Sequence, residues 1–187
     1  ETLNQPFHVM IKPHGPVCNL ACQYCYYLPK TYLYPNSEFR MSSNLLADFT
    51  RKMIASQHSG EVTFSWQGGE PTLMGLDFFK EAVRFQKEIA PPSLGVKNVI
   101  QTNGTRLTPA WCRFFKDHGF LVGLSLDGPP VLHNAYRRDR AGRGTFPGMS
   151  ATAQNQGDEN SQQGAGGRRG HPYTSLQGTC LRGFPGE

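Results

Sequence analysis

Hydrophobic and polar positions alternate between a strand-like and a helix-like periodicity along the first three-quarters of the chain. Short β-prone runs predict strands, and longer segments with apolar residues three and four positions apart predict amphipathic helices. The predicted strands are residues 7–11, 61–66, 97–102 and 120–126, and the predicted helices are residues 42–57, 76–90 and 108–118. Strands and helices that alternate at this spacing form right-handed βαβ units. The pattern therefore predicts an α/β fold with about four parallel strands.

This pattern stops near Phe146. Residues 1–146 carry the whole net charge of +5 and every Ile and Val of the chain, whereas residues 147–187 hold nine of the 21 glycines. A segment without β-branched apolar residues buries too little surface to offset its ordering entropy. We therefore expect one structured region at 1–146 and a disordered tail at 147–187. The tail is either a natural linker or the result of a splice, truncation or reading-frame error.

The overall composition is that of a soluble protein. The chain has 187 residues, 37% of them hydrophobic, and a mean hydropathy of -0.48, and single domains usually run to about 100–200 residues. Its apolar runs fall short of the ~20 residues that a membrane helix needs, so no membrane partner is expected. The sequence opens at Glu1 without a charged-then-apolar leader, which favours a cytoplasmic location, and the missing initiator Met indicates a trimmed or partial chain.

Three closely spaced cysteines follow the first predicted strand. Cys18, Cys22 and Cys25 form a Cys-x3-Cys-x2-Cys motif without a fourth Cys or His at ligand spacing. Structural zinc sites and four-iron clusters normally have four protein ligands, so three thiolates favour a 4Fe-4S cluster with one open iron. The alternatives are zinc with a distant ligand such as His14, a disulfide framework, and cysteines without a common role. Cys112 lies on the third predicted helix and is expected in the core.

The cysteine motif resembles that of the radical S-adenosylmethionine (SAM) superfamily. Further motifs follow in the order found in one of its families, the anaerobic sulfatase-maturating enzymes. These motifs are Ile-Lys-Pro at 11–13, Gln-Gly-Gly-Glu-Pro-Thr-Leu at 67–73, Gln-Thr-Asn-Gly-Thr at 101–105, Gly-Leu-Ser-Leu-Asp-Gly-Pro at 123–129 and His-Asn-Ala-Tyr-Arg at 133–137. The resemblance runs from about residue 7 to 146 and implies the first part of a (βα) barrel of radical SAM type.

The resemblance also implies a reaction. Members of the family bind SAM at the open iron of a 4Fe-4S cluster and cleave it to a 5′-deoxyadenosyl radical. They then oxidise a Ser or Cys of a sulfatase to Cα-formylglycine. The implied cofactors are thus the cluster and SAM, the implied substrate is a sulfatase polypeptide, and the implied electron donor is a protein such as flavodoxin or ferredoxin.

Particular residues match the positions that hold these cofactors in the family. The resemblance assigns the cluster to Cys18, Cys22 and Cys25. It assigns four contacts with SAM: the backbone of Tyr24 with the adenine, Gly69 with the methionine amino group, Ser125 with the ribose, and Arg137 with the methionine carboxylate. A pair of glycines lets a backbone approach a ligand, and an Arg side chain matches a carboxylate at two points. The alternatives are a tight turn at Gly68-Gly69 and a solvated charge at Arg137.

A group of arginines near the end of the structured region raises a different possibility. Basic clusters bind phosphates, and residues 137–143 contain Arg137, Arg138, Arg140 and Arg143. Since no nucleic-acid motif accompanies them, we expect no nucleic-acid partner and interpret the group as a solvated turn with Arg137 alone directed inward.

The sequence departs from the family after residue 146. It lacks the last two strands of the family's six-strand barrel, the cysteine-rich domain that follows, and the carboxylate proposed as catalytic base. We therefore expect the strand at 120–126 to be an uncovered edge prone to self-association. We also expect the chain to bind iron and SAM without converting a sulfatase peptide. Another radical SAM peptide-modifying enzyme and a nonfunctional iron–sulfur-binding fragment are the alternative interpretations.

Overall fold

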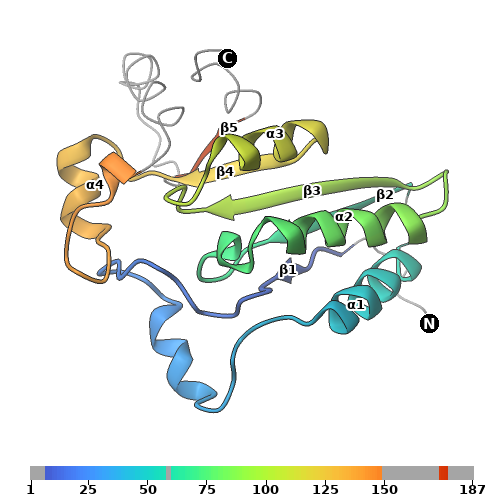
Figure 1. Ribbon diagram of the computed structural model, residues 1–187, viewed down its shortest axis with the longest axis horizontal. Coiled ribbons are helices and arrows are strands. Elements are labelled where there is room, and N and C mark those ends of the chain that lie inside the picture. The colour runs from blue at the N-terminus through green and yellow to red at the C-terminus, as the bar shows by residue number, and fades with distance from the viewer. Residues whose placement is uncertain (1–6, 58–59, 149–172, 177–187) are drawn as a thin grey trace.

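A computed structural model describes residues 7–57, 60–148 and 173–176. Five strands form one sheet in the order β1-β2-β3-β4-β5 (Figure 1). Their bounds are β1 Met10–Ile11, β2 Glu61–Trp66, β3 Gly95–Thr102, β4 Leu121–Ser125 and β5 Tyr173–Leu176. The first four strands are parallel, and β5 is antiparallel to β4. The α/β fold with four parallel strands in the first part of the chain is thus confirmed.

Helices connect the parallel strands. The α-helices are α1 Ser43–Ala55, α2 Leu76–Ile89, α3 Pro109–Asp117 and α4 Pro130–Tyr136, and the 3-10 helices are η1 Leu28–Leu33, η2 Pro71–Met74 and η3 Phe146–Gly148. The predicted helices α1 to α3 begin and end within a few residues of the expected positions. Among the described residues, no helix is both long and apolar enough to cross a membrane.

The core lies between the sheet and the helices. Side chains of a strand point alternately to its two faces, and β2 accordingly buries Val62, Phe64 and Trp66 almost completely. Phe79 of α2 packs its ring edge against the Trp66 ring, with centroids 5.5 Å apart. This contact packs α2 against β2, and parallel pairing of β2 with β3 places the loops that follow both strands side by side.

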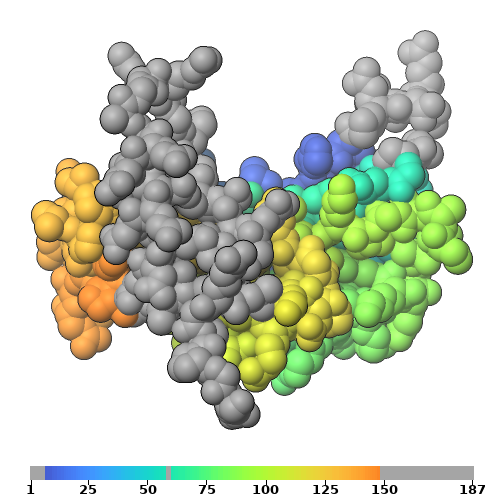
Figure 2. Space-filling view, turned by 90° about the horizontal axis from the view of Figure 1, so that it is seen from above, coloured from blue at the N-terminus to red at the C-terminus, as the bar shows by residue number. Residues whose placement is uncertain are grey.

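The helix α4 was not predicted from the sequence. It has seven residues, too few to show a helical repeat, and it begins directly after Pro129 with another proline, Pro130. A proline at the first helical position is favourable because its fixed φ angle suits a helix. Figures 1 and 2 place the segment that carries α4, in orange, at one end of the molecule.

The strand β5 corrects one part of the prediction for the tail. Residues 173–176 pair with β4, in a register that places Val122 opposite Leu176 and Ser125 opposite Tyr173. The edge of β4 is therefore covered, contrary to expectation. Strand pairing uses backbone hydrogen bonds, so it does not need the β-branched apolar residues that the tail lacks. The rest of 147–187 lies outside the described residues, apart from the end of η3, so the expected disorder there stays a prediction.

Candidate active site

The sequence motifs converge at the carboxyl ends of the parallel strands. The cysteine loop follows β1, the glycine pair follows β2, Asn103 follows β3 and Asp127 follows β4. These ends face the part of the molecule that carries α4 (Figure 1). A cavity of about 260 Å³ opens there, lined by Cys18, Leu20, Cys22, Tyr24, Cys25, Tyr26, Tyr27, Gln67, Gly68, Gly69, Gln101, Thr102, Asn103, Ser125 and Arg137. The structure thus brings all seven residues predicted for cofactor binding to one cavity.

The cysteine loop is fastened to the segment after α4. The backbone N–H of Ala21 donates to the carbonyl of Arg138 at 2.7 Å, and that of Gln23 donates to the carbonyl of Tyr136 at 3.0 Å. Leu20 is buried, at 3% exposure, and pairs with Asp139 in an isolated β-bridge. These contacts hold the loop against the segment that carries Arg137, although more than a hundred residues separate the two in sequence.

The three thiols are free and half-buried. Burial raises the pKa of Cys18 to about 11, and the N–H groups of Leu20 and Asn103 oppose part of that rise. Burial also raises the pKa of Cys22, against the charge of Arg137. Metal ligation requires thiolates, so binding of a metal group by these cysteines would release protons.

The arrangement of the thiols bears on the kind of metal group that they suit. Within the described residues, no set of three or more His, Cys, Asp or Glu side chains could hold a metal ion. Nδ1 of His14, the proposed distant zinc ligand, lies 2.8 Å from the carbonyl oxygen of Phe39. Three free thiols line one cavity, and cysteine thiolates are the usual ligands of iron–sulfur clusters, whereas a structural zinc site normally has four protein ligands.

The glycine pair packs directly on the cysteine loop. A Cβ atom at Gly69 would lie 2.1 Å from the carbonyl oxygen of Val17, a distance that excludes any side chain. The backbone N–H of Gly69 donates to the carbonyl of Gly15 at 2.9 Å, and that of Glu70 donates to Val17, also at 2.9 Å. The sequence pattern predicts that Gly69 makes room for a ligand. In the structure, the group closest to the position of a Cβ at Gly69 is the backbone of the cysteine loop.

Glu70 is a site residue that the sequence analysis did not select. Its side chain is completely buried and accepts hydrogen bonds from both the backbone N–H and the hydroxyl of Thr72, from the hydroxyl of Thr102 and from the backbone N–H of Asn103. Burial raises the pKa of Glu70, and these donors oppose the rise. Glu70 therefore joins the loop after β2 to the loop after β3. Its place beside the glycines in the motif was the available signal.

Arg137 is held by an acidic partner that the sequence analysis also did not select. Its Nε lies 3.1 Å from Oδ1 of Asp127, and the two side chains are only 12% and 16% exposed. Since Nε has no aligned hydrogen-bond acceptor among the described residues, the contact is an ion pair. The Tyr24 hydroxyl donates to the other oxygen of Asp127, and the guanidinium lies 5.6 Å from the centroid of the Tyr24 ring. Arg137 is thus not a solvated charge, whereas Arg138, Arg140 and Arg143 are exposed.

Ser125 has a neighbour that fixes its hydroxyl. Nε2 of Gln101 donates to Oγ of Ser125 at 2.9 Å, so the Ser125 O–H bond is left to donate elsewhere in the cavity that both residues line. A Cβ atom at Gly123 would lie 2.4 Å from Oε1 of Gln101. The glycine in β4 therefore gives the Gln101 side chain the room that it needs.

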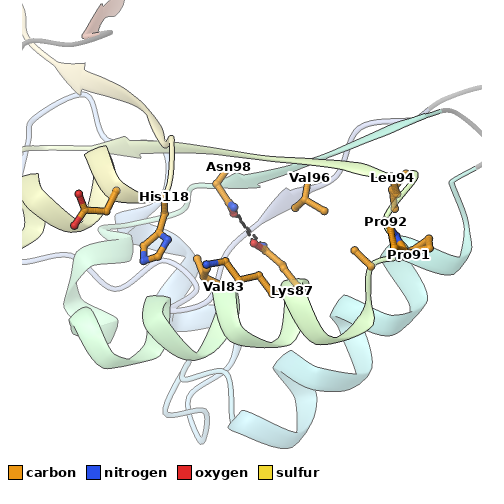
Figure 3. A pocket seen from close by; sticks show the side chains of 11 residues that line it. Val83, Lys87, Pro91, Pro92, Leu94, Val96, Asn98 and His118 are labelled. Carbon is orange, nitrogen blue, oxygen red and sulfur yellow. Dashed lines mark hydrogen bonds between the residues drawn. The ribbon is translucent and has the colours of Figure 1, made fainter.

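A second cavity, of about 400 Å³, lies between α2 and the first half of β3 (Figure 3). Its walls include Val83, Val96 and His118, and Asn98 points into the space between strand and helix. The Asn98 amide exchanges hydrogen bonds with Gln86 and accepts one from the Trp66 indole. These amides are satisfied within the core, and none of the residues predicted for cofactor binding lines this cavity.

A parallel α/β sheet whose first loop presents three free thiols to a cavity at the carboxyl ends of the strands has the architecture of an iron–sulfur α/β enzyme. The model of the radical SAM superfamily matches residues 12–147, and the chain belongs to this superfamily.

Relatives within the superfamily are sulfatase-maturating enzymes. The chain is 48% identical over 143 residues to the serine-type anaerobic sulfatase-maturating enzyme of Klebsiella aerogenes, covering 75% of this chain and 34% of that protein. It is 35% identical over 149 residues to the cysteine-type anaerobic sulfatase-maturating enzyme of Clostridium perfringens, covering 80% of this chain and 40% of that protein.

Solved structures agree with these relatives. Native anSMEcpe with bound AdoMet and Cp18Cys peptide superposes with a TM-score of 0.70 and 36% identity, over 78% of this chain and 38% of that chain. The chain thus spans about a third to two fifths of the length of the relatives and structures named here.

Proposed function

We propose that this chain provides the cofactor-binding part of an anaerobic sulfatase-maturating enzyme, an oxidoreductase that converts a Ser or Cys of a sulfatase polypeptide to Cα-formylglycine. The observation that carries the proposal is the convergence of the three thiols with Tyr24, Gly69, Ser125 and Arg137 on one cavity. The 48% identity with a serine-type maturating enzyme supports this reaction over other radical SAM peptide modifications.

The thiols of Cys18, Cys22 and Cys25 hold three irons of a 4Fe-4S cluster in this proposal, which leaves the fourth iron to SAM. Once reduced, the bound cluster and SAM together supply a 5′-deoxyadenosyl radical. The chain's own part is to hold both groups in a half-buried cavity.

SAM lies across the carboxyl ends of β2 to β4 in this proposal. Arg137 would bind the methionine carboxylate through its terminal nitrogens, while its Nε lies 3.1 Å from Oδ1 of Asp127. The Ser125 hydroxyl, oriented by Gln101, binds the ribose. Backbone at Gly69 binds the methionine amino group, and backbone at Tyr24 lies against the adenine.

The substrate side chain loses two hydrogens in this reaction. For a Ser, Cβ would give up one hydrogen atom to the radical that the bound cofactors supply, with 5′-deoxyadenosine as the by-product. The hydroxyl proton and one further electron then leave, and the C–O bond becomes a carbonyl. The bound cluster would take up that electron, and a donor protein such as flavodoxin or ferredoxin would supply the electron that first reduces it. A cytoplasmic location suits this chemistry, since reduced thiols persist in that compartment.

A chimaera tests the proposed function. Residues 12–147 of this chain would replace the matching segment of the Klebsiella aerogenes enzyme, and the product would be incubated anaerobically with SAM, reductant and a Ser-containing sulfatase peptide. Mass spectrometry should show a loss of about two mass units, which the Cys22→Ala chimaera should not produce. A Cys-containing peptide, assayed in parallel, identifies the substrate type.

Two results would count against the proposed function. A well-folded chimaera that forms 5′-deoxyadenosine but leaves both peptides unchanged would favour another radical SAM peptide-modifying enzyme. A chimaera that neither binds iron nor cleaves SAM would favour a nonfunctional fragment.

A further inference from the structure

Three polar side chains next to Cys18 form a hydrogen-bonded ring. Asn19, Asn103 and Thr105 bond to one another within it. Nδ2 of Asn103 donates to Oδ1 of Asn19 at 3.0 Å, Nδ2 of Asn19 donates to Oγ1 of Thr105 at 2.8 Å, and that hydroxyl donates to Oδ1 of Asn103 at 2.7 Å. The ring joins the cysteine loop to the loop after β3.

The ring fixes which way the Asn103 amide faces. The backbone N–H of Thr105 can only donate, and it lies 3.0 Å from Oδ1 of Asn103. The oxygen of the amide therefore faces Thr105, and the nitrogen must face the cysteine loop. One N–H of Nδ2 bonds to Asn19, and the other points to Sγ of Cys18 at 3.6 Å, within the longer range of a sulfur acceptor.

The Asn103 backbone is anchored as firmly as its side chain. Its N–H donates to the buried carboxylate of Glu70 at 2.7 Å, and the residue is only 7% exposed. Cys18 also receives the backbone N–H of Leu20 at 3.4 Å. The sulfur of Cys18 thus faces two fixed donors, of which the Asn103 amide can be removed by substitution.

We propose that Asn103 sets the reduction potential of the cluster by donating an N–H to the Cys18 thiolate. This inference rests on the proposed function, because it requires the cluster at the cysteine loop. Hydrogen bonds to the sulfurs are among the factors that determine the potential of an iron–sulfur cluster. Reduction adds negative charge to the cluster and its thiolates, so a donor stabilises the reduced form more than the oxidised form and raises the potential.

Two substitutions at Asn103 distinguish the effect of its N–H donor from the effect of its side-chain shape. Asn103→Ala removes the donor without adding charge. Asn103→Asp keeps the shape and both contacts with Thr105, but it replaces the N–H by an acceptor. Asn44→Asp is the matched control, because Asn44 is exposed on α1 and lies outside the cavity.

The experiment is a redox titration of the 187-residue chain after anaerobic reconstitution with iron and sulfide, in the absence of SAM. Electron paramagnetic resonance (EPR) of the reduced cluster gives the midpoint potential. We expect the midpoint to shift to a more negative potential in Asn103→Ala and further in Asn103→Asp, and to stay unchanged in Asn44→Asp.

Several outcomes would overturn the proposal. An unchanged or more positive midpoint in Asn103→Ala would do so. If that variant cannot hold a cluster, an unchanged midpoint in Asn103→Asp would have the same effect. Loss of the cluster from both variants, with a normal cluster in the unmodified protein, would make Asn103 a structural residue. Failure of the unmodified protein to bind a cluster would overturn the proposed function as well, so the two failures are distinguishable.

Discussion

Arg137 and Asp127 form a mostly buried ion pair at the cofactor cavity, with 3.1 Å between Nε and Oδ1. The pair joins the carboxyl end of β4 to the residue directly after α4. It keeps a guanidinium at the cavity wall, and it also keeps a carboxylate close to the position that we propose for the carboxylate of SAM. Removal of either charge should therefore leave the other without its ion-pair partner at the cavity.

Removing the Arg137 side chain should lower SAM affinity by more than the loss of a single contact would. Arg137→Ala leaves the Asp127 carboxylate unpaired beside the ligand carboxylate, so SAM affinity should fall by about tenfold to hundredfold, roughly 1.4–2.8 kcal/mol. The double variant Arg137→Ala with Asp127→Asn should recover part of this loss, because the repulsion is relieved. Anaerobic calorimetric titration with SAM measures both effects.

Arg143→Ala serves as the control for this prediction, since Arg143 is 79% exposed and pairs with Asp139. Its SAM affinity should match that of the unmodified protein. A double variant that binds SAM no better than the single variant would show that Asp127 does not act on the ligand.

The three thiols of the cysteine loop should determine iron binding. Anaerobic reconstitution of the unmodified chain should give about four irons and four sulfides per chain. Replacement of Cys18, Cys22 or Cys25 by Ala should abolish this uptake, because the cluster would keep only two protein ligands. Cys112→Ala should retain the iron, since Cys112 is buried in α3 and does not line the cavity. Iron and sulfide analysis checks the set, and stoichiometric zinc without iron would contradict it.

Gly69 should tolerate no side chain. In Gly69→Ala, the added Cβ would meet the Val17 carbonyl at 2.1 Å, so the loops after β1 and β2 must separate. Overpacking of this kind costs about 1–3 kcal/mol, and we expect a lower free energy of unfolding together with poorer iron retention. Gly60→Ala is the matched control, because no atom of the described residues lies within 4 Å of a Cβ there. Equal urea midpoints for the two variants would show that the contact is unimportant.

Much of this site could be predicted from the sequence. The motif spacing selected seven residues that the structure brings to one cavity, because parallel strands place all their carboxyl ends at the same edge of the sheet. Their roles toward the cluster and SAM stay predictions.

Other features depend on distances that spacing does not encode. Asp127, Glu70 and Asn103 lie inside the selected motifs, but their roles arise from contacts between loops that are far apart in sequence. The contact of Gly69 with Val17 likewise joins two loops that are far apart in sequence. The strand β5 was not predicted, because pairing at a sheet edge uses backbone hydrogen bonds and does not require an apolar side-chain pattern.

His133 should make stability depend on pH. It is buried, its Nδ1 accepts from the Asp127 backbone N–H at 3.4 Å, and its Nε2 lies 3.1 Å from the hydroxyl of Thr145. Burial, followed by the charge of Arg137, lowers the pKa of His133 below its ordinary value of 6.5, and the Asp127 carboxylate opposes this.

The sign of the pH dependence follows from this direction. The unfolded chain binds the His133 proton more readily, so the free energy of unfolding should fall as the pH falls below about 6.5. Urea unfolding at about pH 7.5 and about pH 5 measures the change, and His133→Gln should reduce it. An equal pH dependence in the two proteins would show that folding does not lower the pKa of His133.

The most direct test of the proposed site is the EPR spectrum of the reduced, reconstituted chain before and after addition of SAM. A cluster held by Cys18, Cys22 and Cys25 has one iron without a protein ligand, so binding of SAM should change the spectrum. The change should require a higher SAM concentration in Arg137→Ala. A spectrum of the unmodified protein that is indifferent to saturating SAM would contradict the assignment of this cavity as a SAM site.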